Sequence, residues 1–252
     1  MNTLEFLQRV LPIEGFYVTT VINQDGRKQG FFESVEELAQ TCERLDSTGN
    51  NTYFAISSFN VKGNRKQDNV RATKVIAIDV DCGEGKPYAS WKEGLQELGK
   101  FVHTMSLPKP MIVYSGNGLH VYWVLTEELE PKDWKPLANA MKQAALDKEF
   151  KIDAGLTANS ALVLRPVGTH NPKNGNEVKL LVDAEPVEVS ALTESLSYFY
   201  RDTPRGTESH TRDNTLLENL VSKQEFPLAV GSIVKSKCKQ IDWAVDNQDK
   251  VD

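Results

Sequence analysis

Two aspartates separated by a single residue are the first feature of the sequence that could carry chemistry. Asp79 and Asp81 close the segment VIAIDVD, residues 75–81. Because side chains alternate between the two faces of a strand, both carboxylates lie on one face, with their Cα atoms roughly 7 Å apart. Two anions this close repel each other unless a cation lies between them, and carboxylate oxygens suit Mg²⁺ or Mn²⁺. The pair therefore indicates a metal site. The alternative is two solvated acids, because D-x-D is a short and common string.

A glycine-rich turn followed by a histidine is the second feature. Residues 116–118, Gly-Asn-Gly, join the apolar segments 111–115 and 119–125 and are typical of a hairpin turn. In the second segment His120 and Tyr122 share one face. Glycines let the backbone approach a ligand closely, and the histidine beside them can donate to a phosphate oxygen. A tight hairpin with a surface histidine is the alternative interpretation.

A third acid and a rigid loop follow. Asp153 lies in KIDAGL, where a lone aspartate is usually a cap or turn residue. The string LRPVGTHNPK, residues 164–173, mixes proline and glycine with cations, so it could hold Arg165 and Lys173 near an anion. A plain surface loop is the alternative.

The elements that must position these residues follow from hydrophobic periodicity and capping signals. We predict strands over residues 14–24, 52–59, 75–81, 111–115, 119–125, 161–165 and 178–182. Helices are predicted from the capping boxes at Ser34 and Ser90 and from Pro131. The basic stretch 61–74 is interpreted as a solvated loop. The middle of the chain then runs strand-helix-strand-strand-helix-strand, which predicts the α+β class with an antiparallel sheet like that of an RNA-recognition motif (RRM).

Composition narrows the class of protein. The chain has 252 residues and a net charge of −6, so any contact with nucleic acid needs a local basic patch or bound metal ions. Its three cysteines form no C-x-x-C pair, which argues against a structural zinc site. The sequence has no signal-peptide pattern and no apolar run long enough to span a membrane. We therefore expect a protein of the cytoplasm, or of the host cytoplasm if a phage encodes it.

The motifs in this order resemble those of the archaeo-eukaryotic primase (AEP) superfamily, especially the primase-polymerases of phages and plasmids. The series is IDVD, then SGNGLHVYW, then a later aspartate, then RPVGTHNPK, and it spans about residues 14–183. The preceding GNRKQDNV is also similar to the segment before the first acidic motif of that group. One departure is Val167, where the pattern usually has a second proline. A helicase P-loop motif does not occur in this chain.

The resemblance implies a role for each matching residue. The ligands of a two-metal Mg²⁺ or Mn²⁺ site would be Asp79, Asp81 and Asp153. The groups that bind the incoming nucleotide would be Ser115, His120, Arg165 and Lys173, with Lys86 and Arg65 as further phosphate contacts.

The activity implied is that of a template-dependent nucleotidyltransferase, a DNA primase-polymerase that makes primers on single-stranded DNA from ribo- or deoxyribonucleoside triphosphates during phage or plasmid replication. A helicase in cis or in trans would be a further partner, and no membrane contact is expected. The catalytic domain would cover residues 1–184, with an N-terminal α/β unit over 1–74 and the RRM-like unit over 75–184. Residues 185–252 are interpreted as a helical appendage, the start of a further region of a longer protein.

Two other functions fit parts of the pattern. A non-catalytic module could bind single strands on the same sheet by stacking bases on Tyr122 and Trp123, but it leaves the three acids unexplained. A nuclease of the rolling-circle type would need a histidine pair, and the chain has no H-x-H.

Overall fold

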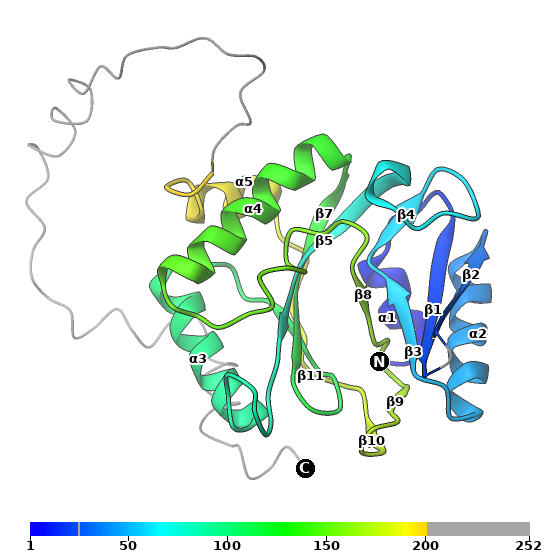
Figure 1. Cartoon of the computed structure of the whole chain (residues 1–252). Helices are drawn as coiled ribbons and strands as arrows, with labels where there is room; N and C mark the ends of the chain where they lie inside the picture. The colour runs from blue at the N-terminus through cyan, green and yellow to red at the C-terminus, as the bar shows by residue number, and fades with distance from the viewer. Residues whose placement is uncertain (25, 201–252) are drawn as a thin grey trace, which may run out of the picture.

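The computed structural model describes residues 1–24 and 26–200, which form two antiparallel sheets with helices packed against them (Figure 1). The five-stranded sheet has the order β11 (Lys179–Val182), β6 (Met111–Tyr114), β7 (Leu119–Leu129), β5 (Val70–Val80) and β4 (Ser57–Phe59). The four-stranded sheet has the order β2 (Gly26–Phe32), β1 (Tyr17–Asn23), β3 (Thr52–Ala55) and β8 (Val163–Leu164). A short ladder pairs β9 (His170–Asn171) with β10 (Asn176–Glu177).

The helices of the described residues are α1 (Thr3–Val10), α2 (Val35–Ser47), α3 (Trp91–Thr104), α4 (Pro131–Asp147) and α5 (Val189–Ser195), with a single 3₁₀ turn, η1 (Gln67–Asn69). The predicted starts of α2 and α3 are confirmed. The hydroxyl of Ser34 accepts from the backbone N–H of Glu37 at 3.1 Å, and that of Ser90 accepts from Glu93 at 3.3 Å. Each bond satisfies one of the backbone donors that the first turn of a helix leaves unpaired.

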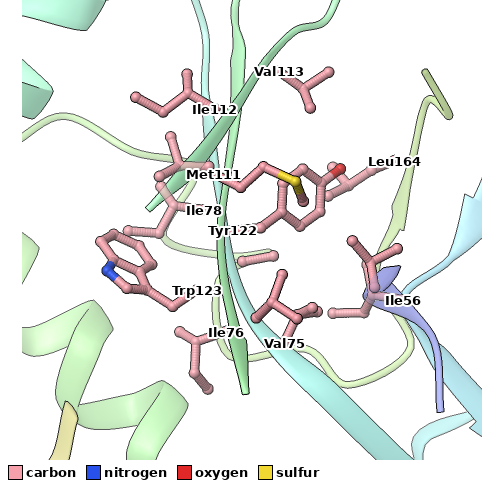
Figure 2. Packing of buried hydrophobic residues seen from close by; sticks show 14 of the residues in the cluster. Ile56, Val75, Ile76, Ile78, Met111, Ile112, Val113, Tyr122, Trp123 and Leu164 are labelled. Atoms are coloured by element: carbon pink, nitrogen blue, oxygen red, sulfur yellow. The ribbon is translucent and has the colours of Figure 1, made fainter. Parts of the chain in front are cut away.

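The long strands β5 and β7 form the centre of the core and have two different apolar faces. Ile76, Ile78 and Trp123 lie on the side of the sheet where α3 and α4 pack (Figures 1 and 2). Val75 and Tyr122 lie on the opposite side, toward the four-stranded sheet (Figure 2). The alternation expected from the sequence is therefore present, and both faces of the sheet are buried.

Helix α1 joins the two sheets. Its first turn has a capping box, in which Asn2 and Glu5 exchange hydrogen bonds of 2.8 and 2.9 Å. The ring of Phe6, which is fully buried, meets Phe54 edge-on at 5.5 Å and Tyr122 at 5.7 Å. Residues from both sheets thus share one core, which fixes the angle between the sheets.

The α+β class is confirmed, but the strand pairing differs from the simple RRM-like order. The predicted strand 52–59 is two strands in different sheets, because the chain breaks at Ile56, whose N–H donates to Leu162. The predicted strand 161–165 is β8, which pairs with β3 and not with β5. The place beside β5 is taken by β4. The two predicted units therefore exchange strands, and the division of the chain near residue 74 stays a prediction.

Two further segments differ from the expectation. The strand β2 was not predicted, because its sequence GRKQG is polar and contains two glycines. The predicted loop 61–74 contains η1 and the first residues of β5.

Within the predicted appendage, α5 packs against the five-stranded sheet, with Leu192 and Leu196 fully buried. The remainder of the appendage, residues 201–252, lies outside the described residues. None of the helices in the described part of the chain is long and apolar enough to cross a bilayer.

Candidate active site

Asp79 stands at the end of β5 on the face that looks toward the four-stranded sheet. It is paired across the sheet with His120 of β7, and 23% of its side chain is exposed. Burial raises the pKa of Asp79 to about 7, and the negative charges of Asp81 and Asp153 add to the shift. A carboxyl group that is this hard to ionise is one that a bound cation would stabilise strongly.

Asp81 and Asp153 come from different parts of the chain, and their charges act on Asp79. We call the region of these three carboxylates the acidic corner. Asp81 lies just after β5, and its carboxylate forms an ion pair of 2.9 Å with Lys86. The backbone N–H of Asp153 donates to the carbonyl oxygen of Asp79 at 3.0 Å, which ties the loop after α4 to the end of β5. The structure therefore brings together the three acids that the sequence singled out.

The acids fit a divalent cation by their chemistry, although their side chains do not point at one common centre. Within residues 1–24 and 26–200, no group of three or more potential ligands has the arrangement of a formed metal site. The Asp153 carboxylate accepts from the N–H groups of Gly155 and Leu156 at 3.0 and 3.1 Å, and Asp81 is engaged with Lys86. Burial, together with the negative charges of Asp81 and Asp153, raises the pKa of Asp79, and bound Mg²⁺ or Mn²⁺ would favour its ionised form. Binding an ion there requires these side chains to rotate toward it.

His120 is a neutral imidazole deep in the same corner. It is 3% exposed, and its Nε2 lies 3.9 Å from the Asp79 carboxylate. Burial lowers its pKa to about 3, and the positive charge of Arg165 acts in the same direction. Its Nδ1 has no hydrogen-bond partner among the described residues. A buried ring nitrogen without a partner is available to a ligand.

The turn of residues 115–118 packs directly on the end of β5. The hydroxyl of Ser115 accepts from the N–H of Gly118 at 3.1 Å, and the Asn117 amide donates to the carbonyl of Cys82. Gly118 approaches so closely that an added Cβ would overlap the carbonyl oxygen of Val80. The predicted close approach of glycine backbone is thus an approach to the strand that carries the acids.

Arg165 is held in the corner by the four-stranded sheet. Its Nη2 donates to Oδ1 of Asn51 at 2.9 Å and to the hydroxyl of Tyr53 at 2.7 Å, and its guanidinium lies 4.7 Å from the centre of the Tyr53 ring. Its positive charge opposes the rise in the pKa of Asp79. Its Nε has no partner among the described residues, so part of this buried cation remains available to an anion.

A similar fold is found in solved primase structures. The structure is similar to the AEP domain of the primase-polymerase of Cyanophage S-2L, with a TM-score of 0.57 and 17% identity over 77% of this chain and 94% of that domain. The chain shares the fold of that AEP domain. A second similar structure is the catalytic domain of primase RepB' in complex with initiator DNA, with a TM-score of 0.52 and 13% identity over 89% of this chain and 100% of that domain.

A third structure, primase RepB', gives a TM-score of 0.51 at 15% identity, and the match spans 79% of this chain and 62% of that protein. The sequence itself matches no family model and no curated protein. The AEP fold therefore rests on the agreement in three dimensions.

The other two predicted phosphate contacts, Lys173 and Arg65, belong to segments outside the acidic corner. Lys173 is exposed in the turn between β9 and β10, a ladder that touches the hairpin turn through hydrogen bonds from Asn174 and Asn176 to the carbonyl of Gly116. Arg65 donates to the carbonyl of Ala161. It lies at the end of the sheet where Ser57 pairs with Thr73, six residues and about 20 Å along β5 from Asp79.

Sequence reasoning missed the residues that orient Arg165. Asn51 and Tyr53 meet it only because β3 pairs with β8, two segments more than 100 residues apart. The sequence offers one weak indication: Tyr53 is an aromatic residue with a polar hydroxyl, next to the apolar residues Phe54 and Ala55. Nothing in the sequence names Asn51.

Proposed function

We propose that this chain is a template-dependent nucleotidyltransferase, a DNA primase-polymerase that makes primers on single-stranded DNA. One observation carries the proposal: three carboxylates, Asp79, Asp81 and Asp153, gather beside the buried donors His120 and Arg165. Phosphoryl transfer needs positioning and neutralisation of charge more than covalent help from the protein. The acids would hold the cations that neutralise charge, and the unpartnered nitrogen atoms of His120 and Arg165 would position the phosphates.

The three aspartates would hold Mg²⁺ or Mn²⁺. When bound, two such ions would lower the pKa of an attacking 3′-hydroxyl and neutralise the charge of the leaving pyrophosphate. The protein's own part is to present oxygen ligands from a rigid strand end. Asp79 is fixed by β5, and the loop of Asp153 is fixed to it by a backbone hydrogen bond.

The triphosphate of the incoming nucleotide would lie between His120 and Arg165. The imidazole is neutral, so it binds a phosphate oxygen through an N–H without adding charge, whereas Arg165 supplies the positive charge. Ser115, in the turn beside them, would be a further contact of the triphosphate. Lys86, which pairs with Asp81, would bind a phosphate in place of that carboxylate. Lys173, in the neighbouring ladder, is a peripheral contact.

The remaining partners follow from the reaction. The nucleotide is a ribo- or deoxyribonucleoside triphosphate and the template is single-stranded DNA. We extend the proposal to a replicative role in a phage or plasmid, supported by the similarity to a cyanophage primase-polymerase and to a primase bound to initiator DNA. A helicase in cis or in trans would be a further partner.

The test is synthesis of labelled oligomers on single-stranded DNA with Mn²⁺, without any primer, with each class of nucleotide in turn. Asp79→Ala should abolish the product, whereas Lys100→Ala, which removes an exposed cation of α3, should leave it intact. Product from Asp79→Ala at the wild-type level would refute the assignment. If no variant, wild type included, makes product but all bind DNA, the chain is a binding module.

A second readout does not depend on catalysis. At 100 times its dissociation constant, an ion that binds only the folded state stabilises it by about 2.7 kcal/mol. Mn²⁺ should therefore raise the melting temperature of the wild type and of Lys100→Ala, but not that of Asp79→Ala.

A further inference from the structure

The strands of the four-stranded sheet carry cations and no carboxylate. Arg27 and Lys28 of β2 are the charged residues within β1, β2, β3 and β8, and Arg165 follows β8 directly. The whole chain has a net charge of −6, so strands without an acidic residue differ locally from the rest of the chain. A surface that binds a polyanion must be less negative than this chain is as a whole.

Strand register assigns Arg27 and Arg165 to the same face of this sheet. Cross-strand partners share a face. The pairs on this face are Ile22 with Arg27, Thr20 with Gln29, Val18 with Phe31, Thr20 with Tyr53, and Ala55 with Val163. Arg165 lies two residues after Val163 and stacks on Tyr53. Lys28 is paired with Val21 and belongs to the opposite face.

A third arginine comes from the loop above the sheet. Arg65 is anchored by its bond to the carbonyl of Ala161, next to Val163. Burial lowers its pKa, and the positive charge of Arg27 adds to the effect, so the two guanidinium groups lie within electrostatic range of each other. The Nε of Arg65 has no hydrogen-bond partner among the described residues, and Arg27 is exposed. Two neighbouring cations without a carboxylate attract an external anion.

This face runs from the edge of the sheet to the candidate active site. From β2 to β8 it is three strand spacings wide, about 14 Å. At its inner end Arg165 acts on the pKa of Asp79, and at its outer end Arg27 is exposed. Between them lies the partly exposed ring of Tyr53, whose strand pairs with β1 at Thr20. Phe31, on the same face, packs against a buried apolar cluster that includes Val18 and Ala55.

We propose that this face, defined by Arg27, Arg65, Tyr53 and Arg165, binds the single-stranded DNA template and leads it to the active site. Guanidinium groups bind the phosphates, and the ring of Tyr53 offers a surface on which a base stacks without sequence preference. The inference rests on the proposed function, and it gives Arg65 a role on the template in place of the nucleotide contact expected from the sequence.

The test compares two charge reversals that are neighbours on one strand. The full chain is titrated against a fluorescently labelled 20-mer of oligodeoxythymidylate in EDTA, with anisotropy as the readout. Arg27→Glu should weaken binding by about tenfold, and the plot of log affinity against log salt should become shallower by about 0.7, the value for one lost phosphate contact on a single strand. Lys28→Glu changes the same charge on the other face and should have an effect below twofold. Arg27→Gln gives a neutral second variant, and melting curves establish that each variant is folded.

Three outcomes overturn the proposal. The first is unchanged DNA affinity in both Arg27 variants. The second is an equal loss in Lys28→Glu, which would mean that net charge and not this face governs binding. The third is an intact DNA affinity with a raised KM for the nucleotide, which would make the face a nucleotide site.

The assay also separates this proposal from the proposed function. Asp79→Ala, tested in the same buffer, should bind the oligomer as the wild type does. If Asp79→Ala were fully active while Arg27→Glu lost DNA binding, the catalytic assignment would fall and the surface would stand.

Discussion

The imidazole of His120 lies 3.9 Å from the carboxylate of Asp79, across neighbouring strands of one sheet, and the two groups do not form a stable ion pair. Burial lowers the pKa of His120 to about 3 and raises that of Asp79 to about 7. Each residue is therefore held toward its uncharged form, although opposite charges so close would attract. The corner is arranged to receive a cation on the aspartate side and an anion on the histidine side.

His120→Ala should mainly raise the KM for the nucleotide, by about tenfold, the equivalent of about 1.4 kcal/mol for one lost hydrogen bond to a charged group. The change in kcat should be smaller, because the metal ligands are untouched. Steady-state incorporation at varied nucleotide concentration measures both constants. His103→Ala, which removes an exposed histidine of α3, is the control. If His120→Ala left the KM unchanged, His120 would not bind the nucleotide and its role would be structural.

Asp79→Asn should stabilise the metal-free protein at high pH. Because the folded pKa is about 7 and the ordinary value is 3.8, the folded state holds more protons than the unfolded state between these values. The wild type therefore loses stability as the pH rises through that window. Urea unfolding in EDTA at pH 8 should show Asp79→Asn to be more stable by about 1–3 kcal/mol, and the difference should vanish at pH 4. Asp68→Asn, at an exposed aspartate of η1, is the matched control for the loss of a carboxylate. A constant difference across the whole pH range would contradict the assigned shift.

Gly118→Ala should damage the candidate site through its backbone. The added Cβ would overlap the carbonyl oxygen of Val80, so the turn must move away from the strand that carries Asp79. We expect a loss of about 1–3 kcal/mol in the free energy of unfolding, as for an overpacked core, with a loss of activity beyond that caused by unfolding. Gly49→Ala is the comparison, because it has open space around the Cβ and only a positive φ of 75° to strain it. Full activity in Gly118→Ala would mean that the turn does not position the site.

The sequence predicted part of the acidic corner because some of its geometry is local. Alternation along β5 and β7 gives the faces on which Asp79 and His120 lie, and the turn of residues 116–118 fixes the register of β7 against β6. The pairing of β7 with β5, which places the two residues opposite each other, is long-range. Asp153 lies more than 70 residues further along the chain, and only the resemblance to known motifs pointed to it. Its hydrogen bond to Asp79 shows how the fold closes that distance.

What the sequence did not predict depends on long-range pairing. The strand β2 has no apolar periodicity of its own and forms because all seven of its residues pair with β1. The chain breaks at Ile56, so that one predicted strand is divided between two sheets. Hydrophobic periodicity does not predict such a division. Arg65 was expected near the triphosphate because it is a cation before the first acidic motif. Its place beside Arg27 follows from the packing of a loop over the other sheet.

Tyr53→Phe tests a positioning residue that only the pairing of β3 with β8 reveals. The hydroxyl of Tyr53 accepts from Arg165 at 2.7 Å, and the ring stacks under the same guanidinium. Phenylalanine keeps the ring and removes the acceptor, so Arg165 stays nearby but loses part of its orientation. We expect the nucleotide KM to rise about three- to tenfold, because a hydrogen bond to a charged group contributes roughly 1.5–3 kcal/mol and Asn51 retains part of the anchorage. Affinity for single-stranded DNA should stay within twofold, since the stacking surface is unchanged. Tyr198→Phe, which removes the hydroxyl of an exposed tyrosine after α5, should alter neither quantity. If Tyr53→Phe combined with Asn51→Ala left the KM unchanged, Arg165 would not bind the nucleotide in the orientation that these two residues give it.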